Sequence, residues 1–266
     1  DAVECDALEG EVWTTEWLRM FYSAMEEKLH QHPLWYRDEN SENPEFWKDM
    51  YEGLENFIFK RLHSLLLTPD LKRRDDNLQK QTAALGCITS AQLDVEWAGR
   101  DQSEDWDSAL SHIAALDRTR TLGEKLLCLN LCLGAITKTL VALLDRQSEH
   151  SRASGGTVVR EGGEKRDNTP VAADDLLPAV IIVIMRAQTR APLPIRVISH
   201  LEMVSRHKRH LLARDQYCLV TFMSAVEFLL HKVTAHSSRA DASEPRTGDV
   251  EDALSSNHVM VDAFSV

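Results

Sequence analysis

Residues 173–185 read ADDLLPAVIIVIM. Two adjacent carboxylates, Asp174 and Asp175, precede an apolar run that ends at Met185. This run has about half of the roughly 20 residues that a membrane span requires, and because we see no longer one we expect no transmembrane segment. Acids at the start of a helix accept hydrogen bonds from the free amides of the first turn and suit the helix dipole. The segment therefore predicts a buried helix that continues to Gln188.

Pro178 suggests different roles for the two acids. Proline has no N–H and is tolerated only in the first turn of a helix. If Asp175 is the N-cap, Pro178 is the third helical residue and costs no hydrogen bond. Asp174 then lies just outside the helix and is free to project.

Helical periodicity dominates the rest of the chain, and no alternating strand pattern is convincing. We therefore expect an all-α protein of about eight or nine helices. The first helix is expected to carry one apolar stripe of Trp17, Met20, Phe21 and Met25. The other expected helices cover residues 46–65, 71–85, 106–116, 122–144, 175–188, 195–206 and 217–233.

The charge of the chain makes nucleic acid an unexpected partner, because the formal net charge is −12. One stretch, residues 186–214, is nevertheless basic and contains Glu202 as its only acid. It is interpreted either as a solvated face or as a docking patch for an acidic partner or a lipid head group.

No sequence feature indicates bond-making chemistry. The chain has no phosphate-binding loop, no dinucleotide-binding glycine motif and no nucleophile elbow. His207 and His210 could share a helical face, but no carboxylate or thiol is placed to complete a metal site. The five cysteines form no CxxC pair and are expected to be free thiols, with Cys128 and Cys132 filling the core. We expect no metal and no cofactor.

The acid pair and the residues around it resemble a known signature. A small residue, two acids, two apolar residues and proline, here residues 173–178, resemble the opening of the GTPase-binding helix of the Vps-nine domain. Tyr217, followed by the small and apolar run 224–229, is similar to the closing helix of that family. The resemblance extends over residues 15–235, and it implies an N-terminal helical bundle packed on a layered helical exchange core.

This resemblance implies a guanine nucleotide exchange factor that performs no covalent chemistry. Its partner would be a GDP-bound or nucleotide-free small GTPase of the Rab-five group. The first acid of the pair acts in the family as a finger towards the P-loop lysine and the GDP phosphate, which implies that Asp174 is the catalytic residue. The GTPase-binding residues implied by the resemblance are Pro178, Tyr217, Asp175, Val220 and Thr221.

The chain departs from the family pattern at several positions. The family usually has threonine three residues after the tyrosine, but here the residue is Val220, and Thr221 follows it. A lost hydroxyl could remove a hydrogen bond worth about 1 kcal/mol. The lead-in 214–216 is also altered, and residues 122–125 lack a proline that opens the long helix in the family.

The resemblance also suggests how the chain is organised. We expect an N-terminal tail over residues 1–14, a helical bundle with lead-in helices over 15–100, an exchange core over 101–236 and a disordered tail over 237–266. Residues 147–169 are rich in Ser, Gly, Glu and Arg, which indicates a flexible insertion in the core.

The expected location is cytoplasmic, with recruitment to early endosomes in vesicle-mediated transport. The chain begins at Asp1 without a signal-peptide pattern, so we expect a fragment of a longer cytosolic protein whose flanking regions could supply peripheral membrane recruitment. Two alternatives remain open. One is a Rab-binding adaptor whose exchange activity has decayed, and the other is a helical scaffold without a GTPase partner.

Overall fold

The computed structural model describes residues 2–35, 43–84, 97, 103–153, 173–190 and 195–240. Over these ranges the chain forms eight α-helices and two short 3-10 segments without a strand, so the predicted all-α class is confirmed. The elements in chain order are α1 (Ala2–Gln31), α3 (Pro44–Leu66), α4 (Pro69–Ala84), η2 (Ser103–Trp106), α5 (Asp107–Ala114), η3 (Ala115–Arg118), α6 (Leu122–Ala153), α7 (Ala173–Arg190), α8 (Val197–His207) and α9 (Ala213–Ala240).

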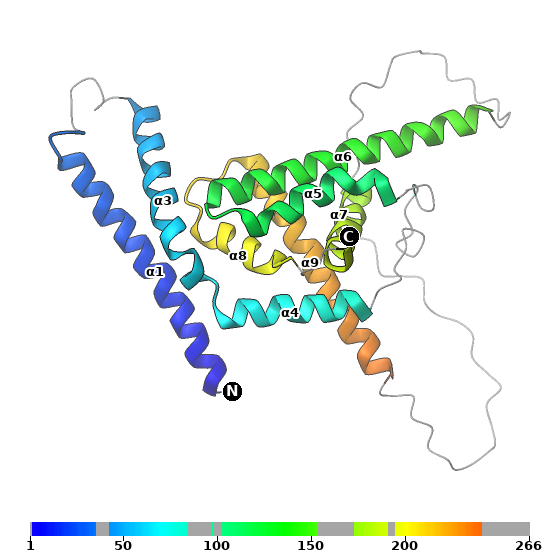
Figure 1. Ribbon diagram of the computed structural model, residues 1–266, viewed down its shortest axis with the longest axis horizontal. Helices are drawn as coiled ribbons and strands as arrows, with labels where there is room; N and C mark the ends of the chain where they lie inside the picture. Colours follow the sequence, from blue (N-terminus) through cyan, green and yellow to red (C-terminus); the bar gives the residue numbers. More distant parts are fainter. Residues whose placement is uncertain are drawn as a thin grey trace, which may run out of the picture.

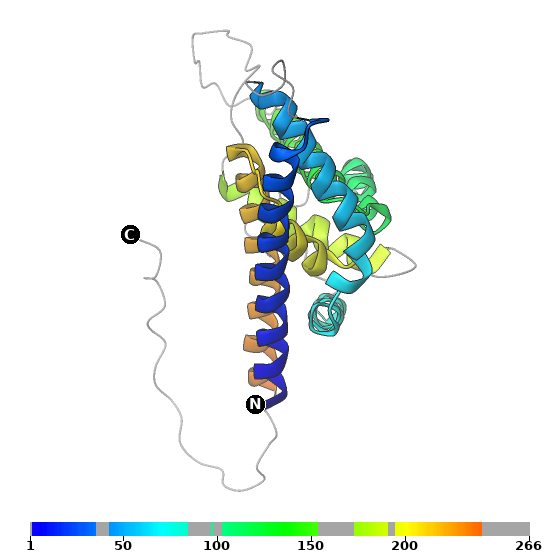
Figure 2. The ribbon, with the colours of Figure 1, turned by 90° about the vertical axis from the view of Figure 1, so that its left-hand side faces the viewer.

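The helices form a layered core with a helix pair at one end (Figure 1). Helices α5 and α6 lie on one side and α4 lies on the opposite side. Helices α7, α8 and α9 lie between them and contact both α4 and α6. Helices α1 and α3 stand at the end of the molecule that faces the viewer in Figure 2. This is the predicted architecture of N-terminal helices packed on a layered core.

Helix α6 is the longest core helix, and its buried side chains recur every three or four residues. They are Leu122, Leu126, Leu129, Cys132, Ile136, Leu140 and Leu143. By length and composition alone, Leu122–Arg146 could also cross a membrane, so our expectation that no segment is apolar enough was wrong. In the fold, however, α6 packs against α3, α5, α7, α8 and α9, which is the position of the core helix of a helical protein.

The start of α6 is secured without the proline that the family pattern contains. The Thr121 hydroxyl accepts a hydrogen bond from the Glu124 amide at 3.2 Å, and the Glu124 carboxylate accepts one from the Thr121 amide at 3.2 Å. This reciprocal pair is a capping box, which satisfies two amides that the helix itself leaves unpaired. The hydrogen bond from Thr121 also helps to hold the pKa of Glu124 below its usual value. The departure at residues 122–125 therefore leaves the helix start intact.

Three of the expected boundaries were wrong because helices run further than the polar composition suggested. Helix α1 begins at Ala2 within the expected N-terminal tail 1–14, α6 continues to Ala153 into the expected insertion, and α9 continues to Ala240. The added segments contain Ala, Glu, Leu and Arg, which favour helix even where they carry little apolar surface. The remainder of the insertion and of the C-terminal tail lies outside the described residues.

The apolar face of α1 also differs from the expected stripe. Leu18 and Tyr22 are buried, whereas Trp17 and Met20 are exposed. Apolar side chains occur on both faces of this helix, so periodicity alone cannot decide which face packs. The choice is made by α3 and by the loop that precedes α9, where Arg209 lies over the Tyr22 ring at 5.5 Å.

Helix α8 is capped by a residue from another helix. Its own N-cap residue, Arg196, makes no capping side-chain hydrogen bond. Instead, the buried Asp75 of α4 accepts hydrogen bonds from the amides of Ile198 at 2.8 Å and Ser199 at 3.2 Å, and from the Ser199 hydroxyl. Burial raises the pKa of Asp75 to about 6, although these hydrogen bonds oppose the shift. This contact ties α4 to the core between residues that are far apart in sequence.

Candidate functional site

The apolar run of α7 lies in the core, as the sequence predicted. Ile181, Val183 and Ile184 are buried, as are most of the residues from Leu176 to Ala187. Helix α7 packs against α4, α5, α6 and α9, so little of its length faces solvent. The part of α7 that can meet a partner is therefore its first turns.

The start of α7 corrects the expected N-cap. The helix begins at Ala173, so Asp174 and Asp175 both lie in its first turn and Pro178 is the sixth helical residue. Asp175 is therefore not the cap that the sequence suggested. The nitrogen of Pro178 cannot donate to the Asp174 carbonyl, which removes the hydrogen bond that would join these two residues in an ordinary helix. Asp174 thus stands on a first turn that has fewer backbone hydrogen bonds than usual.

The two acids nevertheless differ as the sequence suggested. Asp174 is exposed, and its carboxylate has no hydrogen bond or ion pair with any described residue. Asp175 is half-buried and engaged in an interaction with a neighbouring group. Both acids suit the positive end of the helix dipole, but only Asp174 is available to an outside group.

Helix α9, which packs against α7, presents an exposed stripe. Tyr217 is 52% exposed and Val220 is 61% exposed, and Met223 continues the stripe by one further turn. The opposite face of α9 is buried through Cys218 and Phe222, and the helix packs directly against α7. The structure thus brings together the two helices that carry the predicted GTPase-binding residues, and it leaves Tyr217 and Val220 on the surface. Pro178 is half-buried on α7.

Thr221 does not replace the hydroxyl that Val220 lacks. Its hydroxyl donates to the Tyr217 carbonyl within α9 at 2.8 Å, and the residue is only partly exposed. The side chain is one position further round the helix, so it lies beside the stripe. Its hydroxyl proton is already donated to a carbonyl of the same helix. The surface at Val220 is therefore apolar.

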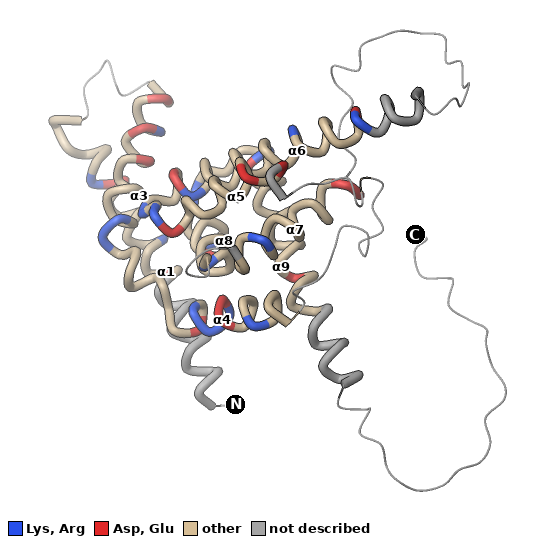
Figure 3. Tube along the Cα trace, turned by 45° about the vertical axis from the view of Figure 1, so that its right-hand side comes forward, with Lys and Arg blue, Asp and Glu red and all other residues tan. Residues whose placement is uncertain are grey.

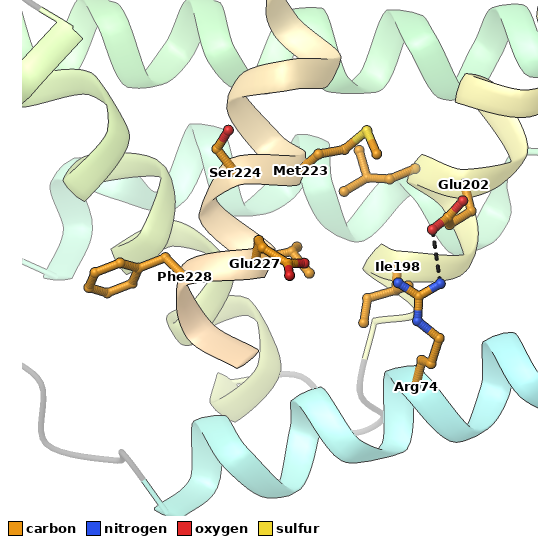
Figure 4. Close-up of a pocket in the computed structure, with 9 residues that line it drawn as sticks. Arg74, Ile198, Glu202, Met223, Ser224, Glu227 and Phe228 are labelled. Atoms are coloured by element: carbon orange, nitrogen blue, oxygen red, sulfur yellow. Dashed lines mark hydrogen bonds and ion pairs between the residues drawn. The ribbon is translucent and has the colours of Figure 1, made fainter. Parts of the chain in front are cut away.

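A groove that sequence patterns had not identified opens beside this stripe. It has a volume of about 480 Å³ and lies between α4, α8 and α9. Figure 4 shows Met223 directed towards α8, with Phe228 on the other side of α9. Arg74 of α4 and Glu202 of α8 are joined at 2.9 Å at its edge. Only the spacing of Met223, three residues after Val220, could have indicated this extension.

The basic stretch 186–214 is neither a simple solvated face nor a continuous docking patch. Several of its cations are paired with carboxylates: Arg206 with Glu202 at 2.8 Å, Lys208 with Glu55 at 2.7 Å, Arg209 with Glu26, and Arg214 with Asp215 at 3.5 Å. In Figure 3 basic and acidic positions are interspersed along the helices. Much of this positive charge therefore holds elements of the fold together.

The thiols of the described core are structural. Cys132 and Cys218 are buried, and Cys128 is partly buried against the core. Burial raises the pKa of the Cys218 thiol to about 12, so it stays protonated at neutral pH and is a poor nucleophile. Within the described ranges, no three His, Cys, Asp or Glu side chains are grouped closely enough to hold a metal ion.

The fold and this surface describe a helical domain with exposed apolar residues of the kind that bind another protein. Residues 106–233, from the end of η2 into α9, match the Vacuolar sorting protein 9 (VPS9) domain family. The chain therefore carries a VPS9 domain, and the resemblance seen in the sequence is confirmed. A comparison with curated proteins found no match. Membership indicates a guanine nucleotide exchange factor whose partner is a Rab GTPase.

Proposed function

We propose that this domain accelerates GDP release from a Rab-five-like GTPase, with Asp174 as the catalytic residue. The observation that supports the proposal best is the exposed carboxylate of Asp174, which pairs with no described residue and stands at the start of a helix that packs against α9. Tyr217, Val220 and Met223 offer the apolar surface on which a switch region can dock, and the adjoining groove can receive one further side chain.

Docking on α9 would bring the acid of α7 to the nucleotide. A GTPase holds GDP through a P-loop lysine, backbone amides and a magnesium ion. A carboxylate that reaches this site competes with the phosphate for the lysine and repels the β-phosphate. Two unit charges 4 Å apart interact by about 4 kcal/mol at an effective dielectric constant of 20. This energy is sufficient to accelerate release by two to three powers of ten, since about 1.4 kcal/mol corresponds to tenfold.

The direct test is the release of fluorescent GDP from purified Rab-five-like GTPases with catalytic amounts of the chain. We expect the release rate to rise in proportion to the concentration of the chain, and to rise most for a member of the Rab-five group. Rabs of other groups serve as the specificity control. If none of the GTPases responds but one binds stably, the chain is an adaptor.

The adaptor remains the second candidate because of Val220. Its exposed side chain has no hydroxyl, and the Thr221 hydroxyl donates to the Tyr217 carbonyl within α9. Both features reduce the polar contacts that α9 can offer to a switch region. The exposed carboxylate of Asp174, which pairs with no residue in the described ranges, favours the active exchange factor over the adaptor.

Restoring the hydroxyl at position 220 is expected to strengthen the interaction with the GTPase. Val220→Thr changes one exposed methyl group to a hydroxyl, and a new hydrogen bond of about 1 kcal/mol corresponds to roughly a fivefold gain in catalytic efficiency. The measurement is the dependence of GDP release on GTPase concentration. Val220→Ala is the matched control, since it shortens the side chain without adding a hydroxyl. Equal rates for the two variants would show that no switch residue uses this position for a hydrogen bond.

The proposal also places the protein in the cytoplasm with recruitment to early endosomes, the membranes on which Rab-five-like GTPases act. This location rests on the proposed partner. Microscopy of the tagged full-length protein tests it, and a distribution unrelated to an endosomal Rab marker would contradict it.

A further inference from the structure

The connection between α8 and α9, residues 208–212, leads directly into the stripe of α9. Helix α8 ends at His207 and α9 begins at Ala213, so Tyr217 lies about one turn beyond this connection. The position of residues 208–212 therefore determines where the first turns of α9 lie.

Helix α3 holds the connection through a buried carboxylate. Glu55 is 2% exposed, accepts a hydrogen bond from the Lys208 ammonium at 2.7 Å, and accepts another from the Arg209 amide at 3.3 Å. Glu52, one turn earlier on α3, lies 3.6 Å from the same ammonium group. Because the carboxylate binds one side chain and one backbone amide, it constrains the chain direction as well as the charge.

Helix α1 holds the next residue. The Arg209 guanidinium makes two contacts with the Glu26 carboxylate, one of them at 3.1 Å, and it lies 5.5 Å from the centre of the Tyr22 ring. The hydrogen bond that Arg209 donates to Glu26 raises the pKa of Arg209, so this side chain stays charged. A planar two-contact pair of this kind fixes orientation better than a single contact does.

The far end of the connection is joined to the core. Asp215, in the first turn of α9, accepts hydrogen bonds from the Leu212 amide at 3.2 Å and from the Asn130 side chain of α6 at 2.9 Å. The start of α9 is thus held between the N-terminal helices on one side and α6 on the other. Helices α1 and α3 lie outside residues 106–233, the part that matches the VPS9 domain.

We infer that α1 and α3 position the start of α9 through Glu26 and Glu55, so that Arg209 and Lys208 are positioning residues for Tyr217 and Val220. Loss of these ion pairs shifts the docking stripe without touching the GTPase. The expected loss of nucleotide exchange rests on the proposed function, whereas the positioning of α9 by α1 and α3 does not. Displacement of α1 would reduce exchange by the same route.

Swapping the charges of Glu26 on α1 and Arg209 in the connection tests this inference in the full chain. Glu26→Arg and Arg209→Glu each place like charges together, and we expect each to lower the catalytic efficiency of GDP release roughly three- to tenfold. The double variant Glu26→Arg with Arg209→Glu restores opposite charges and should recover most of this loss. The matched control is Arg19→Glu, which reverses a charge of the exposed Arg19–Glu16 pair within α1.

Hydrogen exchange of the amides from 208 to 220 gives a second reading that does not require a GTPase. We expect faster exchange of these amides in both single variants and recovery in the double variant, while the amides of α7 stay unchanged. Unchanged amide exchange in folded single variants would overturn the inference, and so would failure of the double variant to recover. If the wild-type chain accelerates no GTPase but the amide pattern follows this expectation, the proposed function fails and the coupling stands.

Discussion

Replacement of Asp174 by alanine is expected to slow GDP release catalysed by the chain on the order of a hundredfold. The side chain is exposed at the start of α7 and pairs with no described residue, so its removal disturbs no described contact of the fold. What is lost is the charge that competes for the P-loop lysine and repels the phosphate. This charge becomes desolvated only when the GTPase docks, and its effect is therefore concentrated in the exchange step.

The neighbouring acid supplies the control for this prediction. Asp175→Asn keeps the shape of a half-buried side chain in the same turn and should alter exchange little, at a cost of about 1 kcal/mol or less in stability through the helix dipole. Asp174→Asn separates charge from shape, and we expect it to be nearly as slow as the alanine variant. Circular dichroism must show the same helical content throughout. If folded Asp174→Ala releases GDP at the wild-type rate, Asp174 is not the catalytic residue.

Replacement of Asp75 by alanine is expected to lower the free energy of unfolding by about 3 kcal/mol. The carboxylate accepts hydrogen bonds from two backbone amides at the start of α8 and from the Ser199 hydroxyl, all of them buried. Alanine leaves these donors without an acceptor in a place that water does not reach, and each such group costs about 1 kcal/mol or more. Chemical denaturation of the two proteins measures the difference. Asp76→Ala, at the exposed next position, should change stability by no more than about 0.5 kcal/mol.

The pH dependence of this site has a definite sign. Burial raises the pKa of Asp75 to about 6 in the folded protein, above its ordinary value of 3.8. An acid whose folded pKa is raised contributes most stability when it is protonated, and this contribution is lost as the pH rises through the interval between the two values. The stability of wild type relative to Asp75→Asn, which does not titrate, should therefore increase as the pH falls from about 7 to about 4. A constant difference would contradict the raised pKa.

Much of the fold could be predicted from apolar spacing. The core helices α6 and α7 appear in the sequence as periodic or continuous apolar segments, and their buried residues agree with that reading. Spacing failed at α1, where apolar residues lie on both faces, and at helix ends whose sequence is polar but helix-favouring. It also could not show that Asp75 caps α8, because the two residues that meet are more than a hundred positions apart.

The sequence by itself determined the all-α class, the family, and the acid pair that marks the start of α7, since these depend on residue type and local order. Only the tertiary structure showed that Asp174 pairs with no described residue while Asp175 is engaged, and that Val220 is exposed while the Thr221 hydroxyl is bonded within α9. It alone showed that the basic stretch before α9 is held by acids of α1 and α3. The physical reason is that exposure and ion pairing depend on which distant side chains fill the neighbouring space, and local sequence does not specify them.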